Sequence, residues 1–173
     1  FEVIHMFKEV EFTQVSENAV DLFKNRWALV TAGDGEKFNT MTVSWGAVGE
    51  LWGKDMATIY IRPQRYTEEF LNANDYFTVS FYPMDMKQKI HSVCGSKSGR
   101  DVDKVQECGL TPAFDEKAPY FDEAEIVLVC KKAAKAKFDP ADFLDDTIDG
   151  KWYPDKDYHF IYYGEIEKVL ISK

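Results

Sequence analysis

Two short segments of the sequence bring basic side chains together with the expected starts of helices. In the first, "RPQRYT", Arg62 and Arg65 precede a helix that is expected to begin at Thr67. The first N–H groups of a helix lack intrahelical partners and carry partial positive charge, so guanidinium groups beside them complete a site suited to an anion. In the alternative interpretation, the arginines form surface ion pairs with Glu68 and Glu69 while Thr67 only caps the helix.

The second segment, "SKSGRDVDK", combines small residues with cations. Ser98 and Gly99 give a flexible approach to a helix that is expected to use Asp101 as its N-cap. Arg100 and Lys104 are spaced by one helical turn and are expected to share one helix face, where both could meet the same anion. The alternative is a solvated helix face, because charged side chains commonly occupy exposed helical positions.

The anion is expected to be one phosphate monoester. The sequence contains no G-x-x-x-x-G-K-[ST] spacing and no evident Asp pair that would hold Mg²⁺ beside a triphosphate. It has no G-x-G-x-x-G after a strand, which argues against a Rossmann dinucleotide domain. Aromatic residues make up 15% of the chain, so a flat aromatic ligand with one phosphate fits, and FMN and pyridoxal phosphate are both candidates. No lysine can be singled out for a Schiff base.

Polar and apolar side chains alternate along "FNTMTVSW", residues 38–45, which is typical of a strand with one buried face. After Asn39, the residues in order are Thr40, Met41, Thr42, Val43, Ser44 and Trp45. The polar positions therefore hold hydroxyl groups, where an ordinary solvated strand would also use Lys, Glu or Arg. The hydroxyls indicate either the β-propensity of threonine or a wall that hydrogen-bonds a ligand.

Composition excludes several classes of protein. A chain of 173 residues predicts one domain, with residues 1–6 interpreted as a disordered or non-native extension because Met6 could be the natural start. The net charge of −9 argues against a nucleic-acid partner. No apolar run approaches the roughly 20 residues of a membrane helix, and the first residues do not form a signal peptide. We therefore expect a cytoplasmic protein without a membrane partner.

The cysteines and histidines do not follow the spacing of a metal site. Cys94, Cys108 and Cys130 form no C-x-x-C pair, and their odd number argues against a disulfide framework. The three histidines are scattered, with no H-E-x-x-H. The sequence therefore predicts reduced thiols and no metal.

A mainly β framework must position these segments. About six strands of uneven length, with short helices between them, favour an antiparallel barrel over a parallel sheet. Gly164 is expected to bend the last strand. The expected strands are 26–33, 38–45, 56–63, 76–82, 125–138 and 158–171; the expected helices are 16–23, 67–74, 85–95, 99–109 and 139–144, with Ser16, Thr67, Asp85, Asp101 and Asp139 as N-caps.

Four motifs in order, "FNTMTVSWG", "IRPQRYT", "SGRDVDK" and "YYGEIEKV", resemble the flavin reductase-like proteins with an FMN-binding split barrel, and most closely the flavoredoxin type. The resemblance extends from about Phe7 to Leu170. It implies a Greek-key split β-barrel with short peripheral helices, which forms a homodimer with FMN at or near the subunit interface.

The family's motifs also imply roles for individual residues, with His159 as a further candidate. The matching positions imply that Asn39, Met41, Thr42, Ser44 and Trp45 line the flavin ring, that Arg62, Arg65, Tyr66 and Thr67 meet the ribityl-phosphate side, and that Ser98, Gly99, Arg100 and Lys104 close over the phosphate. The hydroxyl strand is then a ligand wall, because charged side chains against a flat ring would be buried and unpaired.

The resemblance implies flavin oxidoreduction, in which electrons pass from NADH or NADPH through FMN to a free flavin or a small redox protein. Cofactor chemistry needs no protein nucleophile or base, so no catalytic residue is predicted. An electron carrier without NAD(P)H activity is the alternative, since no separate nicotinamide site can be identified. A ligand-binding barrel without flavin, and a pyridoxamine phosphate oxidase of the same barrel class, match the motifs less well.

Overall fold

The computed structural model of the protein describes residues 6–173, so all of the extension expected at residues 1–6 except Met6 lies outside the described residues. The strands are β1 (Phe7–Val10), β2 (Ala28–Gly33), β3 (Phe38–Val43), β4 (Gly46–Leu51), β5 (Lys54–Ile61), β6 (Tyr76–Phe81), β7 (Pro112–Ala113), β8 (Tyr120–Phe121), β9 (Ile126–Lys137) and β10 (Phe160–Ser172). The helices are η1 (Phe12–Gln14), α1 (Ala19–Asp21), η2 (Leu22–Arg26), α2 (Tyr66–Ala73), η3 (Met84–Met86), α3 (Lys87–Cys94), α4 (Lys104–Cys108), η4 (Pro140–Asp142) and α5 (Thr147–Trp152).

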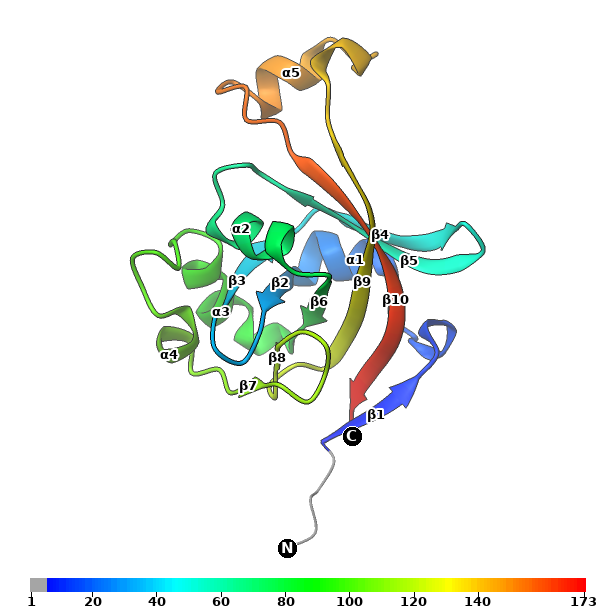
Figure 1. The fold of residues 1–173 in the computed structure, drawn as a ribbon, viewed down its shortest axis with the longest axis vertical. Helices are drawn as coiled ribbons and strands as arrows, with labels where there is room; N and C mark the ends of the chain where they lie inside the picture. Colours follow the sequence, from blue (N-terminus) through cyan, green and yellow to red (C-terminus); the bar gives the residue numbers. More distant parts are fainter. Residues whose placement is uncertain (1–5) are drawn as a thin grey trace, which may run out of the picture.

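One antiparallel sheet of eight strands forms the body of the molecule (Figure 1). Its order is β3-β2-β6-β9-β10-β5-β4, and β1 pairs with the last part of β10. β3 and β4 follow one another in the chain but stand at opposite ends of this order, and β3 also contacts β5. The sheet therefore curls back on itself and leaves a split, which confirms the mainly β, split-barrel expectation.

Period-two burial gives the sheet an apolar layer on each face. Val30, Phe77 and Leu128 belong to the barrel interior. Leu29 and Val127, one residue away in their strands, belong to a second cluster that α3, α4 and the β7–β8 hairpin cover. Both faces of β2 are buried for this reason, and its six residues are all buried.

Gly164 permits the expected bend in β10. The register between β9 and β10 shifts at Tyr163/Gly164, as in a β-bulge. A Cβ at Gly164 would lie 2.5 Å from Cζ of Phe77, so a side chain here would collide with the barrel interior.

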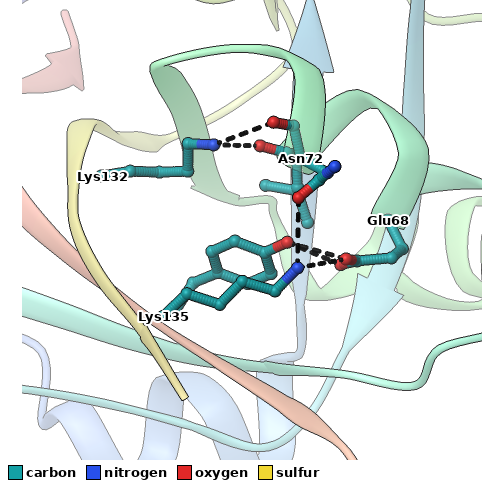
Figure 2. A network of polar contacts seen from close by, with 6 residues as sticks. Glu68, Asn72, Lys132 and Lys135 are labelled. Carbon is teal, nitrogen blue, oxygen red and sulfur yellow. Dashed lines mark hydrogen bonds and ion pairs between the residues drawn. The ribbon is translucent and has the colours of Figure 1, made fainter. Parts of the chain in front are cut away.

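A buried polar network fixes α2 against β9 and β10, and Figure 2 shows its Glu68, Asn72, Lys132 and Lys135 side chains. Glu68 is only 8% exposed and accepts hydrogen bonds from Tyr162 Oη at 2.8 and 2.9 Å and from Lys135 Nζ at 2.9 Å. Lys135 also donates to Asn72 Oδ1, and Lys132 donates to backbone carbonyls of α2. Glu68 is thus satisfied without either arginine of the first anion segment.

The structure corrects several expected element ends. The strand expected over 38–45 ends at Val43, and the one expected from residue 26 begins at Ala28, after Trp27 with a φ of 66°. The expected Asp139 cap is confirmed, because its side chain accepts from Ala141 N–H ahead of η4. Five elements were not expected from the sequence: β1, β4, β7, β8 and α5. Segments that are short or weakly amphipathic carry little periodic signal.

Four of the expected N-caps are wrong. Asn18, not Ser16, caps α1, and the chain continues from α1 into η2. Thr67 lies inside α2 after Arg65, and Asp85 lies inside η3. Asp103 caps α4, which begins at Lys104 and not at residue 99. Asp101 precedes this cap in a turn that the local Gly and Asp residues favour.

Candidate functional site

A cavity of about 340 Å³ lies beside the split of the barrel, and we call it the ring pocket. Residues 41–45 line it from β3 and the turn after it, and Tyr60 lines it from β5. The other lining residues are Arg62, Arg65, Trp152 and His159. The ring pocket therefore collects Met41, Thr42, Ser44, Trp45, Arg62 and Arg65 from the predicted set.

The open edge of β3 contributes backbone groups to the ring pocket. β3 is an edge strand, so half of its peptide groups have no partner strand. Lys104 Nζ donates to Thr40 O at 2.7 Å, which shows that the backbone of Thr40 faces this edge. Backbone direction repeats every two residues, so the N–H and C=O of Thr42 face the same edge. A ligand with a polar edge would find both a donor and an acceptor there.

Arg62 connects the ring pocket to the segment 138–159, which we call the arm. Its guanidinium lies 3.0 Å from Asp157 Oδ1, donates to Trp152 O at 3.0 Å, and lies 5.1 Å from the centre of the Tyr153 ring. Figure 1 shows α5, which belongs to the arm, held away from the barrel beyond the ends of β9 and β10. Arg62 thus ties the arm to the body, and its pairing with Glu68 or Glu69 in the alternative interpretation is wrong.

His159 is neutral at pH 7 and closes one side of the ring pocket. Its Nδ1 lies 2.7 Å from Tyr153 Oη, and its ring centre lies 5.0 Å from that of Trp45. Burial, with a smaller contribution from Arg62, lowers the pKa of His159 to about 4. The residue therefore offers a neutral imidazole next to an aromatic wall.

A second cavity, of about 260 Å³, adjoins the ring pocket through Arg65, and we call it the phosphate pocket. It lies between the first turn of α2 and the loop that follows α3. Its lining residues are Gln64, Arg65, Tyr66, Thr67, Gly95, Ser96, Lys97, Ser98 and Lys104. The two predicted anion segments therefore meet in one cavity, and the helix start at Arg65–Thr67 leaves backbone donors beside it.

Two cations of the phosphate pocket, the half-buried Arg65 and the buried Lys104, converge on one carbonyl group. Arg65 Nη2 lies 3.0 Å and Lys104 Nζ 3.5 Å from Cys94 O, at the end of α3. Burial lowers the pKa of Arg65 and lowers that of Lys104 to about 8. No carboxylate lies within ion-pair distance of either cation among residues 6–173. A bound anion would supply the charge that both lack.

Three predicted residues line a neighbouring cavity instead. Asn39, Gly99 and Arg100 border a cavity of about 540 Å³ that shares Lys104 with the phosphate pocket. Asn39 Nδ2 donates to Thr67 Oγ1 at 2.8 Å, and a Cβ at Gly99 would lie 2.0 Å from Asn39 Oδ1. Asn39 therefore holds Thr67 at the start of α2, and Gly99 leaves room for the Asn39 amide.

Arg100 does not share a helix face with Lys104, so that expectation is wrong. Arg100 precedes α4, lies 3.4 Å from Glu69 and stacks 4.5 Å from the Tyr66 ring centre. Its side chain is 47% exposed, whereas Lys104 is 5% exposed. Glu69 thus pairs with a cation as the alternative interpretation holds, but with Arg100 and not with Arg62 or Arg65.

The hydroxyl row of β3 faces the helices that cover the sheet. Thr40 Oγ1 lies 2.8 Å from Thr31 Oγ1 and is buried, so it is used within the sheet. Thr42 Oγ1 lies 2.6 Å from His91 Nδ1 on α3 and is half-buried at the ring pocket. Ser44, beyond the strand, lines the ring pocket and the groove next to it.

An apolar groove of about 580 Å³ continues from the ring pocket. Ser44, Trp45, Tyr60 and Trp152 line both, and Phe23, Phe138, Phe143 and Tyr153 are among the other lining residues of the groove. Trp45 and Trp152 pack edge to face at 5.2 Å, yet they are 37% and 42% exposed. Sequence reasoning missed Tyr60, Trp152 and the arm, because no pattern in the sequence indicates that the arm returns to β3.

The cysteines are buried in the apolar layers. Cys94 and Cys108 lie with their sulfurs 3.7 Å apart in the outer layer, and burial raises the pKa of both thiols. No group of three metal-ligating side chains occurs within residues 6–173. Among these same residues, no helix has the length and apolar character needed to cross a membrane.

The fold is a split antiparallel barrel with an aromatic-walled cavity beside a cationic one. A family model described as the flavin reductase like domain matches residues 20–173, and the chain belongs to this family. The motifs of the sequence therefore identified the family correctly.

Several solved structures share this fold. An FMN-binding domain of a flavin reductases-like enzyme from Shewanella baltica matches with a TM-score of 0.68 and 16% identity, over 96% of this chain and 77% of that chain. Flavoredoxin from Methanosarcina acetivorans matches with a TM-score of 0.66 and 23% identity, over 86% of this chain and 68% of that chain. The styrene monooxygenase flavin reductase from Pseudomonas putida S12 matches with a TM-score of 0.63 and 15% identity, over 94% of this chain and 86% of that chain. Comparison with curated proteins gave no match. Membership of the family supports FMN as the cofactor.

Proposed function

We propose that the protein is an FMN-dependent oxidoreductase that passes electrons from NADH or NADPH to a free flavin or a small redox protein. The observation that carries this proposal is the junction of the ring pocket and the phosphate pocket at Arg65. A flat ring with a phosphate at the end of a short chain has the same two parts. The phosphate pocket alone, at about 260 Å³, is smaller than ordinary ligand sites of about 300–1,000 Å³, but the two pockets joined fall within that range.

The donors of the two pockets match the parts of FMN. The phosphate fits the half-buried Arg65, the buried Lys104 and the N–H groups at the start of α2. A polar ring edge fits the open peptide groups of Thr42, and the apolar remainder fits Trp45 and Tyr60. When bound, FMN would supply the two-electron chemistry, while these residues bind it, orient it and exclude water.

The proposal extends to a homodimer formed through the apolar groove. The groove is lined by aromatic rings, and its rim carries Trp45, Trp152 and Val20, of which Val20 is 70% exposed. Exposed apolar patches of this kind mark interaction sites. The three buried free thiols are compatible with a reducing compartment such as the cytoplasm.

The second candidate is an electron carrier that binds FMN but does not react with a nicotinamide. The composition of the groove beside the ring pocket favours it, because Lys24 is the only charged residue in the groove's lining. A nicotinamide dinucleotide carries phosphates that need more cations than this. In that case the groove would receive another protein surface and not a dinucleotide.

An anaerobic titration tests the function. The purified protein is given FMN, freed of excess, and followed by visible absorbance as NADH or NADPH is added. The proposed function predicts that a bound flavin band appears and bleaches with a nicotinamide. A band that bleaches only with dithionite would favour the electron carrier, and absence of FMN uptake would overturn both candidates.

Dimer formation is tested separately by sedimentation of the wild-type protein and of Trp152→Ala. The proposal predicts a dimer for the wild type and a weaker dimer for the variant. A wild-type protein that is monomeric at micromolar concentration, with and without FMN, would overturn the proposed interface.

A further inference from the structure

His91 lies outside both pockets but contacts a residue that lines the ring pocket. It stands on α3, is 5% exposed, and places Nδ1 2.6 Å from Thr42 Oγ1. The Trp27 ring packs edge-on against it, with 5.6 Å between ring centres. Thr42 belongs to the edge strand and is among the residues that line the cavity, so this contact joins the outer helical layer to the ring pocket.

His91 is a neutral imidazole at pH 7. Burial, with a smaller effect of Lys87, lowers its pKa to about 4. Lys87 itself stacks 4.2 Å from the Trp27 ring centre, so a fixed cation stays close by. A neutral imidazole presents either an N–H or a lone pair at Nδ1, but not both.

The contact therefore restricts the Thr42 hydroxyl. A free threonine hydroxyl can rotate, donate one hydrogen bond and accept two. If His91 Nδ1–H donates, the hydroxyl proton remains for the pocket; if Nδ1 accepts, only lone pairs remain. In both tautomers the rigid imidazole decides which group Thr42 presents, because β3 and α3 are both fixed by the core.

We propose that His91 is a positioning residue that fixes the Thr42 hydroxyl so that its remaining hydrogen-bonding group meets the polar edge of the flavin ring. This inference rests on the proposed FMN site and adds to it a residue that does not touch the ligand. The hydroxyl of Thr42 and its unpaired backbone N–H and C=O then hold fixed positions before the ligand binds. Preset groups bind more tightly because less freedom is lost on binding.

A double-mutant cycle tests this coupling. FMN affinity is measured by flavin fluorescence for the wild type, Thr42→Val, His91→Leu and the double variant. We expect each single variant to bind about tenfold more weakly, the size of one hydrogen bond, and the double variant to bind no more weakly than Thr42→Val. The visible band of bound FMN should shift alike in all three variants. The inference would be overturned if His91→Leu bound FMN with wild-type affinity. It would also be overturned if the affinity loss of the double variant equalled the product of the two single losses.

A matched pair of variants separates positioning from packing. Asn can place an amide close to the position of Nδ1, whereas Gln places it close to Nε2, and both keep a polar side chain in the same space. His91→Asn should restore affinity to within about twofold of the wild type and restore the visible band, because it keeps one hydrogen bond to Thr42. His91→Gln should resemble Thr42→Val. Equal affinities for Asn and Gln would contradict the inference, even if His91→Leu fails to fold.

The outcome for the proposed function is read first and separately. If the wild-type protein takes up no FMN, both the function and the His91 inference fail. If it takes up FMN and the cycle shows no coupling, the function stands and only the inference fails. Thermal unfolding of each ligand-free variant shows that an affinity change is not a loss of fold.

Discussion

The phosphate pocket and the ring pocket share Arg65 but are built in different ways. The phosphate pocket uses two helix ends and a loop, and its cations Arg65 and Lys104 have no carboxylate partner within residues 6–173. The ring pocket uses a strand edge, a neighbouring strand and the arm, and its groups are peptide bonds, aromatic rings and the neutral His159. The first is an electrostatic site and the second is a site of shape and weak polar contacts. We therefore expect affinity to depend mainly on the phosphate pocket, and redox properties on the ring pocket.

Removing Arg65 is expected to have the largest effect. Arg65→Ala deletes a half-buried guanidinium from the junction of the pockets, and a hydrogen bond to a charged group contributes about 1.5–3 kcal/mol. FMN affinity should fall by about 100-fold in a fluorescence titration. Arg100→Ala is the matched control, because its half-exposed side chain pairs with Glu69 and should change affinity less than about threefold. Equal losses in the two variants would contradict the placement of the phosphate.

The alkaline limb of binding should come from Lys104. Burial lowers the pKa of Lys104 to about 8 in the free protein, and a bound phosphate must raise it. The complex therefore holds more protons than the free protein above pH 8, and affinity should fall as pH rises, by up to about tenfold per pH unit. Lys104→Arg keeps the charge at every accessible pH and should lose this dependence. A wild-type affinity that stays constant from pH 7 to 9.5 would contradict the assignment.

The acid limb of stability should come from two buried histidines, His159 in the ring pocket and His91 behind it. His91 and His159 have pKa values of about 4 in the fold and about 6.5 when unfolded. The unfolded chain therefore binds more protons between these values, so stability is complete above pH 6.5 and falls toward pH 4, by about 1–3 kcal/mol per histidine. Urea unfolding from pH 7 to 4.5 measures this loss. The His91→Asn variant should lose less stability over this pH range. If its loss equals that of the wild type, the fold does not lower the pKa of His91.

The contrast between the two pockets also explains what the sequence could predict. Two short contiguous motifs contain the main phosphate-pocket residues Arg65, Thr67, Ser98 and Lys104. Each motif indicates an anion site from the sequence alone. Asp101 and Arg100 were misplaced because the helix begins three residues after Asp101, at a competing cap, Asp103. The choice between two neighbouring aspartates depends on tertiary packing, which local propensity does not contain.

The ring pocket was less predictable because it depends on contacts distant in sequence. Trp152 meets Trp45, and Thr42 meets His91, across long stretches of chain. The alternation in 38–45 correctly indicated a strand, but the functional feature of β3 is its position at the sheet edge. Strand order is a property of the whole sheet, so no short motif could reveal it. The hydroxyls of Thr40 and Thr42 turn toward other protein groups, a detail that β-propensity alone leaves open.

Trp152→Ala is expected to have the smallest effect on affinity and gives the sharpest test of the contrast. Trp152 lines the ring pocket from the arm, is 42% exposed, and packs edge to face on Trp45. An aromatic pair of this geometry contributes about 0.5–1.5 kcal/mol, and part of that is lost to exposure, so FMN affinity should fall by only about threefold. The midpoint potential of the bound flavin should move instead, because the variant admits water beside the ring, and the Arg65→Ala variant with FMN bound at high concentration should keep its potential. An affinity loss for Trp152→Ala equal to that of Arg65→Ala would mean that the aromatic wall also governs binding, and that the two pockets are one energetic site.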